Sequence, residues 1–128
     1  MVKSAAVVIG CYVLSVLLVL ATDPLLSRLF PGDYVVGRVP SSPALAASTA
    51  FFILIALFCA WLCARLAPDP GSRPLLWFFV IGEAMGVATI IPNWNRGWPH
   101  WYWLSWLFAW PVCCWLGLRA ARRVPRTA

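Results

Sequence analysis

A chain of 128 residues that is 62% hydrophobic and only 11% charged is too apolar for a soluble domain, because soluble domains are about half apolar and about a quarter charged. The formal net charge of +6 comes from 10 basic residues against 4 acidic ones. The basic residues stand at the ends of apolar runs and in the C-terminal tail, not along one face of a domain, which argues against nucleic acid as a partner. The sequence therefore predicts a protein that acts in or at a membrane.

Four apolar runs are each long enough to cross the hydrocarbon layer as a helix, which takes roughly 20 residues for about 30 Å. The residues between these runs are too few to form a soluble domain. We therefore expect residues 1–128 to form a single membrane domain, an all-α polytopic bundle of four transmembrane helices. The expected helices cover residues 4–22, 44–66, 74–91 and 100–118.

The distribution of lysine and arginine predicts the orientation of the bundle, because cytoplasmic loops carry an excess of positive charge. With four spans, both termini lie on the same side of the membrane. That side carries Lys3, Arg65, Arg73, Arg119, Arg122, Arg123 and Arg126. The opposite side carries Arg28, Arg38 and Arg96. The difference predicts cytoplasmic N and C termini and a multi-pass protein of the cytoplasmic (inner) membrane.

The first apolar run is expected to stay in the protein as a span and not to be cleaved as a signal peptide. It is longer than the roughly 7–15 apolar residues of a signal peptide. It also ends in Thr22-Asp23-Pro24, without the small-residue pattern of a cleavage site.

The third apolar run holds Glu83, the one acidic residue inside any of these runs. Counting along ideal helices places it within about 3 Å of the bilayer midplane, where a charged carboxylate is costly. Tyr12, Ser15 and Trp110 fall at a similar depth and are its candidate neighbours. Two interpretations are open: Glu83 is a proton or cation site, or it is a protonated side chain that holds helices together by hydrogen bonds.

Two glycines four residues apart, Gly82 and Gly86, stand beside Glu83. Small residues at this spacing share one face of a helix and let a neighbouring backbone approach closely. We expect this pair to be a helix-packing surface, either inside the bundle or between two copies of the chain.

Polar and aromatic residues gather between the third and fourth runs, in the stretch NWNRGWPHWYW. They could bind a lipid headgroup or a small ligand by stacking and hydrogen bonds. The favoured interpretation is an anchor at the membrane–water interface, where indole rings concentrate. The candidate residues are Asn93, Trp94, Arg96, Trp98, His100 and Trp101.

All five cysteines lie inside apolar runs, where a thiol usually behaves as a small apolar side chain. The sequence has no Cys-x-x-Cys pair, no zinc-ligand spacing, no nucleotide-binding loop and no hydrolase motif. We therefore predict no metal, no cofactor and no catalytic residue. The sequence favours a protein without enzymatic activity, although it does not decide the question.

Three features carry a resemblance: Gly10-Cys11-Tyr12 in the first run, Ala64–Pro68 at the end of the second, and the basic tail. On these features the whole chain resembles small bacterial integral membrane proteins with four spans, a group with no known activity. Length and span number are also similar to those of small multidrug transporters and fluoride channels. The former carry an essential glutamate in the first helix, where this chain has none, and the motifs of the latter have no counterpart here.

The leading hypothesis is a small structural or accessory membrane protein that acts through contacts with membrane lipids or with another membrane protein. Association of the chain with further copies of itself is also expected. The alternative is a small proton-coupled transporter or channel subunit that works as a dimer and uses Glu83.

Overall fold

The computed structural model describes residues 2–35, 38–67 and 73–125. These residues form four α-helices and no β-strand, which confirms the predicted all-α fold. Arg126, one of the basic residues used to predict the orientation, lies outside them. The helices are α1 (Val2–Leu29), α2 (Ser42–Leu66), α3 (Arg73–Asn93) and α4 (His100–Arg123).

Two helices extend well beyond the apolar runs from which they were expected. α1 continues through Pro24 to Leu29, and α4 continues to Arg123. A proline removes one backbone hydrogen bond from a helix interior, so the last turns of α1 need another source of stability. Leu26 supplies it, because its side chain is fully buried and its carbonyl accepts the N–H of Phe30 at 2.8 Å.

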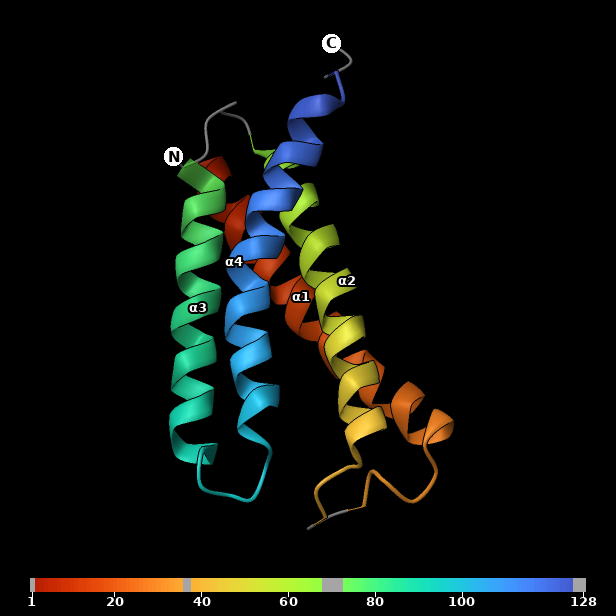
Figure 1. Cartoon of the computed structure of the whole chain (residues 1–128). Coiled ribbons are helices and arrows are strands. Elements are labelled where there is room, and N and C mark those ends of the chain that lie inside the picture. The colour runs from red at the N-terminus through yellow and green to blue at the C-terminus, as the bar shows by residue number, and fades with distance from the viewer. Residues whose placement is uncertain (1, 36–37, 68–72, 126–128) are drawn as a thin grey trace.

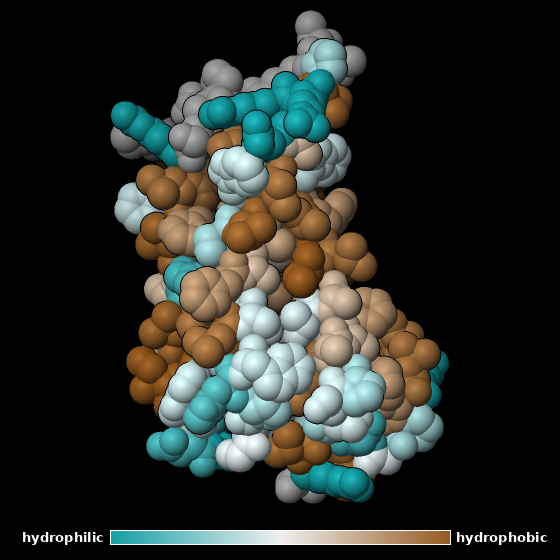
Figure 2. Space-filling model, viewed as in Figure 1, coloured by the Kyte–Doolittle hydropathy of each residue, from teal (hydrophilic) through white to brown (hydrophobic). Residues whose placement is uncertain are grey.

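Each of the four helices is long and apolar enough to cross a membrane, so the chain is a multi-pass membrane protein. Large apolar side chains are exposed on the outside of the helices, and Phe108 is 71% exposed. In a bilayer these side chains face hydrocarbon. Figure 2 shows hydrophilic residues in teal gathered toward two ends of the visible face, with mainly hydrophobic residues in brown between them.

Consecutive helices run in opposite directions, and the first residue of α1 and the last residue of α4 lie at the same end of the bundle (Figure 1). We call this the terminal end, and we call the end that carries residues 30–35, 38–41 and 94–99 the loop end. α2 and α4 make the most extensive contact of any helix pair. α1 packs against α2 and α3, and α3 also packs against α4.

The core lies in the half of the bundle nearer the terminal end. Most of its side chains are small, and cysteine and alanine supply the greater part of them. Small side chains let helices approach closely where lipid provides no hydrophobic drive for association. The buried residues of this core are Val8, Cys11, Ala56, Cys59, Ala60, Cys63, Leu75, Phe78, Trp110, Cys113 and Cys114.

Gly117 lies where α4 meets the backbone of α2. A Cβ atom added there would lie 2.7 Å from the Cβ of Ala60 and 2.8 Å from the backbone nitrogen of Trp61. Backbone atoms cannot move aside as a flexible side chain can, so this position accommodates glycine alone.

Toward the loop end, α1 and α2 diverge from α3 and α4 in Figure 1, but side chains still join α2 to α4. The hydroxyls of Ser48 and Tyr102 lie 3.3 Å apart and join α2 to α4. The rings of Phe52 and Trp106 stack with centroids 4.1 Å apart and an angle of 16° between planes. The bundle is therefore closed between α2 and α4 and opens between α1 and α3.

Candidate functional site

The opening between α1 and α3 is a cavity of about 580 Å³ in the loop-end half of the bundle. All four helices line it. We call it the lateral cavity, and its lining residues lie within 12–20 on α1, 52–56 on α2, 82–90 on α3 and 103–110 on α4.

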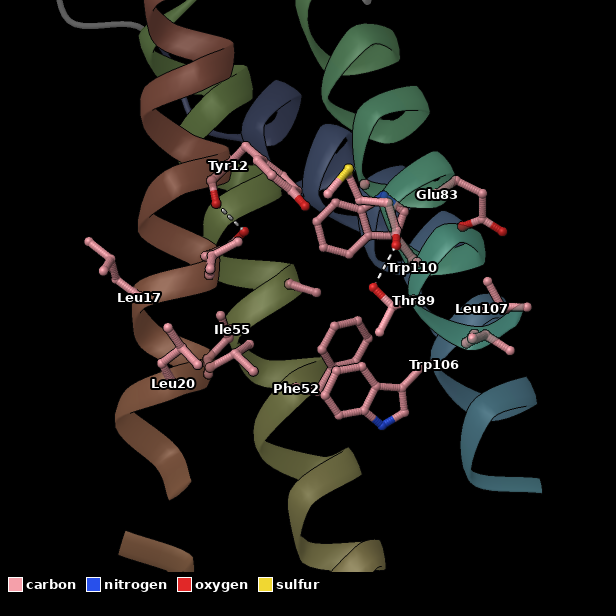
Figure 3. A pocket seen from close by; sticks show the side chains of 18 of the residues that line it. Tyr12, Leu17, Leu20, Phe52, Ile55, Glu83, Thr89, Trp106, Leu107 and Trp110 are labelled. Atoms are coloured by element: carbon pink, nitrogen blue, oxygen red, sulfur yellow. Dashed lines mark hydrogen bonds between the residues drawn. The ribbon is translucent and has the colours of Figure 1, made fainter. Parts of the chain in front are cut away.

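The walls of the lateral cavity differ in chemistry. α1 contributes an aliphatic wall that includes Leu17 and Leu20, whereas α2 and α4 contribute the stacked rings of Phe52 and Trp106 (Figure 3). Thr89 on α3 points toward these rings, and its hydroxyl donates to the backbone carbonyl of Met85 at 2.8 Å. The interior surface is almost entirely apolar, because most lining side chains are hydrocarbon and the hydroxyls of Ser15 and Thr89 are bonded within their own helices.

Glu83 lies at the edge of the lateral cavity, on α3. In Figure 3 its carboxyl group points to the side of α3 away from Tyr12. The side chain is half-buried, and its Oε2 atom is buried without a hydrogen-bond partner among the described residues. The carboxyl group is thus a polar group at membrane depth whose hydrogen-bonding capacity is not fully used.

Tyr12, Ser15 and Trp110, the candidate neighbours of Glu83, line the same cavity. Ser15 donates its hydroxyl proton to the backbone carbonyl of Tyr12 at 2.6 Å, and Trp110 donates its indole N–H to the backbone carbonyl of Phe79 at 3.1 Å. The structure places the three residues around one cavity with Glu83. Ser15 and Trp110 donate their hydrogen bonds to backbone carbonyls, however, and not to the carboxyl group of Glu83.

The two glycines of α3 face α4 inside the bundle. A Cβ atom on Gly82 would overlap the indole ring of Trp110, whereas a Cβ atom on Gly86 would lie 3.6 Å from the Cδ2 of Leu107, an ordinary contact. Gly82 is therefore the glycine that admits the ring of Trp110, and Gly86 has room for a methyl group.

Trp103 and Trp106 also line the cavity, and the sequence analysis does not single them out. The Nε1 atom of each is buried without a hydrogen-bond partner among the described residues. With Trp110 they recur at intervals of three and four residues, which is the spacing of one helical face. This spacing could have identified the two tryptophans from the sequence, but it is difficult to recognise among the other tryptophans nearby.

The aromatic residues between α3 and α4 pack against one another. The rings of Trp94 and His100 are stacked with centroids 4.1 Å apart, and His100 Nε2 lies 3.2 Å from the backbone carbonyl of Trp94. Asn93 donates to the carbonyl of Thr89 at 2.7 Å. Trp98 lies against Tyr102, with ring centroids 5.5 Å apart.

The same loop also contains an edge-to-face ring contact, an exposed arginine and a glycine turn. Trp101 meets Tyr102 edge to face. The backbone N–H of Arg96 donates to the carbonyl of Asn93 at 3.1 Å, and the Arg96 side chain is exposed. The turn that follows uses Gly97 at a φ of 86°, a conformation that favours glycine.

The five cysteines are free and buried, and they lie in the core at the terminal end. Among the described residues, no group of three or more histidine, cysteine, aspartate or glutamate side chains is arranged to hold a metal ion. The thiols therefore act in this structure as small apolar side chains that let the helices pack closely.

Comparison of the chain with protein-family models, with curated proteins and with solved structures gave no match.

Proposed function

We propose that the protein is an accessory membrane protein that binds the hydrocarbon part of a membrane lipid in the lateral cavity. The observation that carries this proposal is the cavity itself, about 580 Å³ in volume and open between two membrane-spanning helices. Ligand sites in proteins commonly measure about 300–1,000 Å³. The volume therefore suits a ligand much larger than a water molecule.

The position and lining of the cavity support a lipid as the occupant. The cavity lies along spans whose outer surfaces are apolar, so the molecules that reach it by lateral movement are those of the hydrocarbon layer. Apolar cavities exclude water because water finds too few polar partners there. A hydrocarbon chain fills such a space and regains the dispersion contacts that an empty cavity lacks.

A photoreactive phosphatidylcholine with a diazirine on one acyl chain tests the proposal in reconstituted vesicles. In the unchanged protein, we expect labelling on the α1 peptide that contains Leu17 and Leu20. Thr89→Phe places a ring into the cavity and should abolish that labelling. Ala88→Phe is the matched control, because Ala88 is exposed on the same helix and does not line the cavity.

Equal labelling of the unchanged protein and of both variants would contradict the proposal, because it would mean that the probe reaches α1 from the surrounding bilayer. The helical content of both variants, measured by circular dichroism, should match that of the unchanged protein. This control separates loss of the site from loss of the fold.

A second function, a proton or cation site in a small transporter or channel, is favoured by Glu83. Its Oε2 atom is buried without a hydrogen-bond partner among the described residues, at the edge of the same cavity. Ionisable side chains at membrane depth commonly mark ion or proton pathways. The test is pH-dependent flux in vesicles, which Glu83→Gln should abolish. Flux that is unchanged in this variant excludes the role.

For the orientation, we propose that the terminal end faces the cytoplasm and that the membrane is a bacterial inner membrane. The support is the excess of lysine and arginine at this end. A green fluorescent protein fused to the C-terminus should fluoresce in cells, whereas alkaline phosphatase fused at the same place should be inactive. The reverse pattern would place the termini outside.

A further inference from the structure

A second cavity, of about 450 Å³, lies between α1 and α3 at the terminal end. Its chemistry changes with depth. Ser4 and Arg73, from the first turns of the two helices, supply its polar groups, and apolar side chains such as Val8, Trp77 and Ile81 line it deeper in the bundle. We call it the terminal cavity.

We propose that the terminal cavity is a binding site for an anionic phospholipid, with the lipid phosphate at Arg73 and Ser4 and one acyl chain between α1 and α3. The order of its groups along the bundle supports this. Ile81 lies about 12 Å from Arg73 along α3, whereas half of the hydrocarbon layer measures about 15 Å. A polar entrance above an apolar groove of this length matches a headgroup followed by the upper part of a chain.

Charge selects an anionic headgroup. Arg73 is exposed at the cavity, and a guanidinium group pairs with phosphate through several N–H donors at once. The described residues of this end carry no aspartate or glutamate, and Asp69 lies outside the described residues. Figure 2 shows hydrophilic residues concentrated at this end, at the top of the view.

Two other arginines at this end belong to α2 and α4, whose residues do not line the cavity. Arg65 donates to the backbone carbonyl of Val124 at 2.9 Å, and Arg119 lies over the ring of Trp115, 4.6 Å from its centroid. Arg73 is therefore the arginine that the terminal cavity presents to a ligand.

A soluble phosphate would use only the entrance of this site. It would leave the apolar surface of Val8, Ile9 and Ile81 without a partner. A phospholipid uses both parts, because its headgroup and its chain are joined in the same order as the polar and apolar groups of the cavity. The terminal cavity therefore fits a phospholipid better than it fits a soluble phosphate.

Lipid titration followed by native mass spectrometry of the full chain tests this inference, with phosphatidylglycerol and phosphatidylcholine of identical chains. We expect phosphatidylglycerol to bind about five-fold more tightly, the effect of one basic residue near an anionic lipid. Arg73→Gln should remove this preference. Arg122→Gln is the matched control, because Arg122 is exposed at the same end and does not line the cavity.

A second pair of variants tests the groove. Ala5 is exposed and lines the cavity, whereas the neighbouring Ala6 is exposed and does not. Ala5→Phe should fill the groove and weaken phosphatidylglycerol binding, and Ala6→Phe should leave it unchanged. Glycerol phosphate should not compete with the lipid, because it lacks the chain.

Three results would overturn the inference: equal losses in Arg73→Gln and Arg122→Gln, no effect of Ala5→Phe, or competition by glycerol phosphate. The first would show diffuse attraction to the basic end, and the other two would show that the groove is not used. The inference is independent of the lateral cavity, so Thr89→Phe should leave the preference for phosphatidylglycerol intact.

Discussion

The contact between α2 and α4 is closed along the bundle, whereas the space between α1 and α3 holds both cavities. The closed side joins its helices by three different means along its length. At the terminal end, Gly117 admits the backbone of α2. Toward the loop end, Phe52 stacks on Trp106, and the hydroxyls of Ser48 and Tyr102 meet.

The open side lacks comparable matching in the loop-end half. α1 presents aliphatic side chains such as Leu17 and Leu20, and both are more than half exposed. Lipid chains solvate such side chains as well as another helix would, so apolar character alone does not draw two spans together. In this bundle, close-fitting shapes and polar contacts, not hydrophobicity, therefore decide which helices meet.

Of the packing variants, Gly117→Leu should cause the largest loss in the free energy of unfolding, because it forces α4 away from α2. The new side chain would meet the backbone of α2 at Ala60 and Trp61. Overpacking costs about 1–3 kcal/mol and occasionally more, and we expect at least about 3 kcal/mol here because backbone must move. Unfolding by added SDS in mixed micelles, followed by tryptophan fluorescence, measures the loss.

Gly10→Leu is the matched control at an exposed position of α1. A Cβ atom at Gly10 would meet no atom within 4 Å. The variant should change the free energy of unfolding by less than about 0.5 kcal/mol, as surface substitutions usually do. Equal losses at Gly10 and Gly117 would mean that the loss at Gly117 does not come from the contact between α4 and α2.

Gly82→Ala should have an intermediate effect, of about 1–3 kcal/mol, because its methyl group would overlap the ring of Trp110. Moving that ring also strains the hydrogen bond from its N–H to the carbonyl of Phe79. Gly86→Ala should be nearly neutral, since its methyl group makes an ordinary contact. Thermal unfolding of both variants in detergent, measured by circular dichroism, makes the comparison.

A double mutant tests whether the ring of Trp110 is the cause. Trp110→Phe removes the overlapping part of the side chain, so Gly82→Ala should cost less in that background than alone. Additive losses would show that the methyl group acts through another contact.

Tyr102→Phe should have the smallest effect. It removes the hydroxyl that lies 3.3 Å from the hydroxyl of Ser48, and such contacts between membrane helices average roughly 0.6 kcal/mol. Ser48→Ala should cost a similar amount, and the double mutant should cost no more than either single change. A double mutant that loses the sum of both would show that the two hydroxyls do not interact.

The sequence predicted the fold class more completely than it predicted the candidate site. It predicted the four helices and singled out Gly82 and Glu83, because a break in an apolar run is visible without a structure. It did not single out Trp106 or Gly117. Each of these two residues contacts a partner on α2 that is distant in sequence.

The number and approximate extent of the spans follow from the sequence alone, because length and hydropathy are local properties of each run. Which faces meet and where space remains depend on how the helices pack against one another. α1, α2 and α3 are apolar on nearly all sides, so no amphipathic stripe in their sequences marks an inner face. The pairing of α2 with α4, and the two cavities beside α1, follow from shape complementarity that arises only when the helices are brought together.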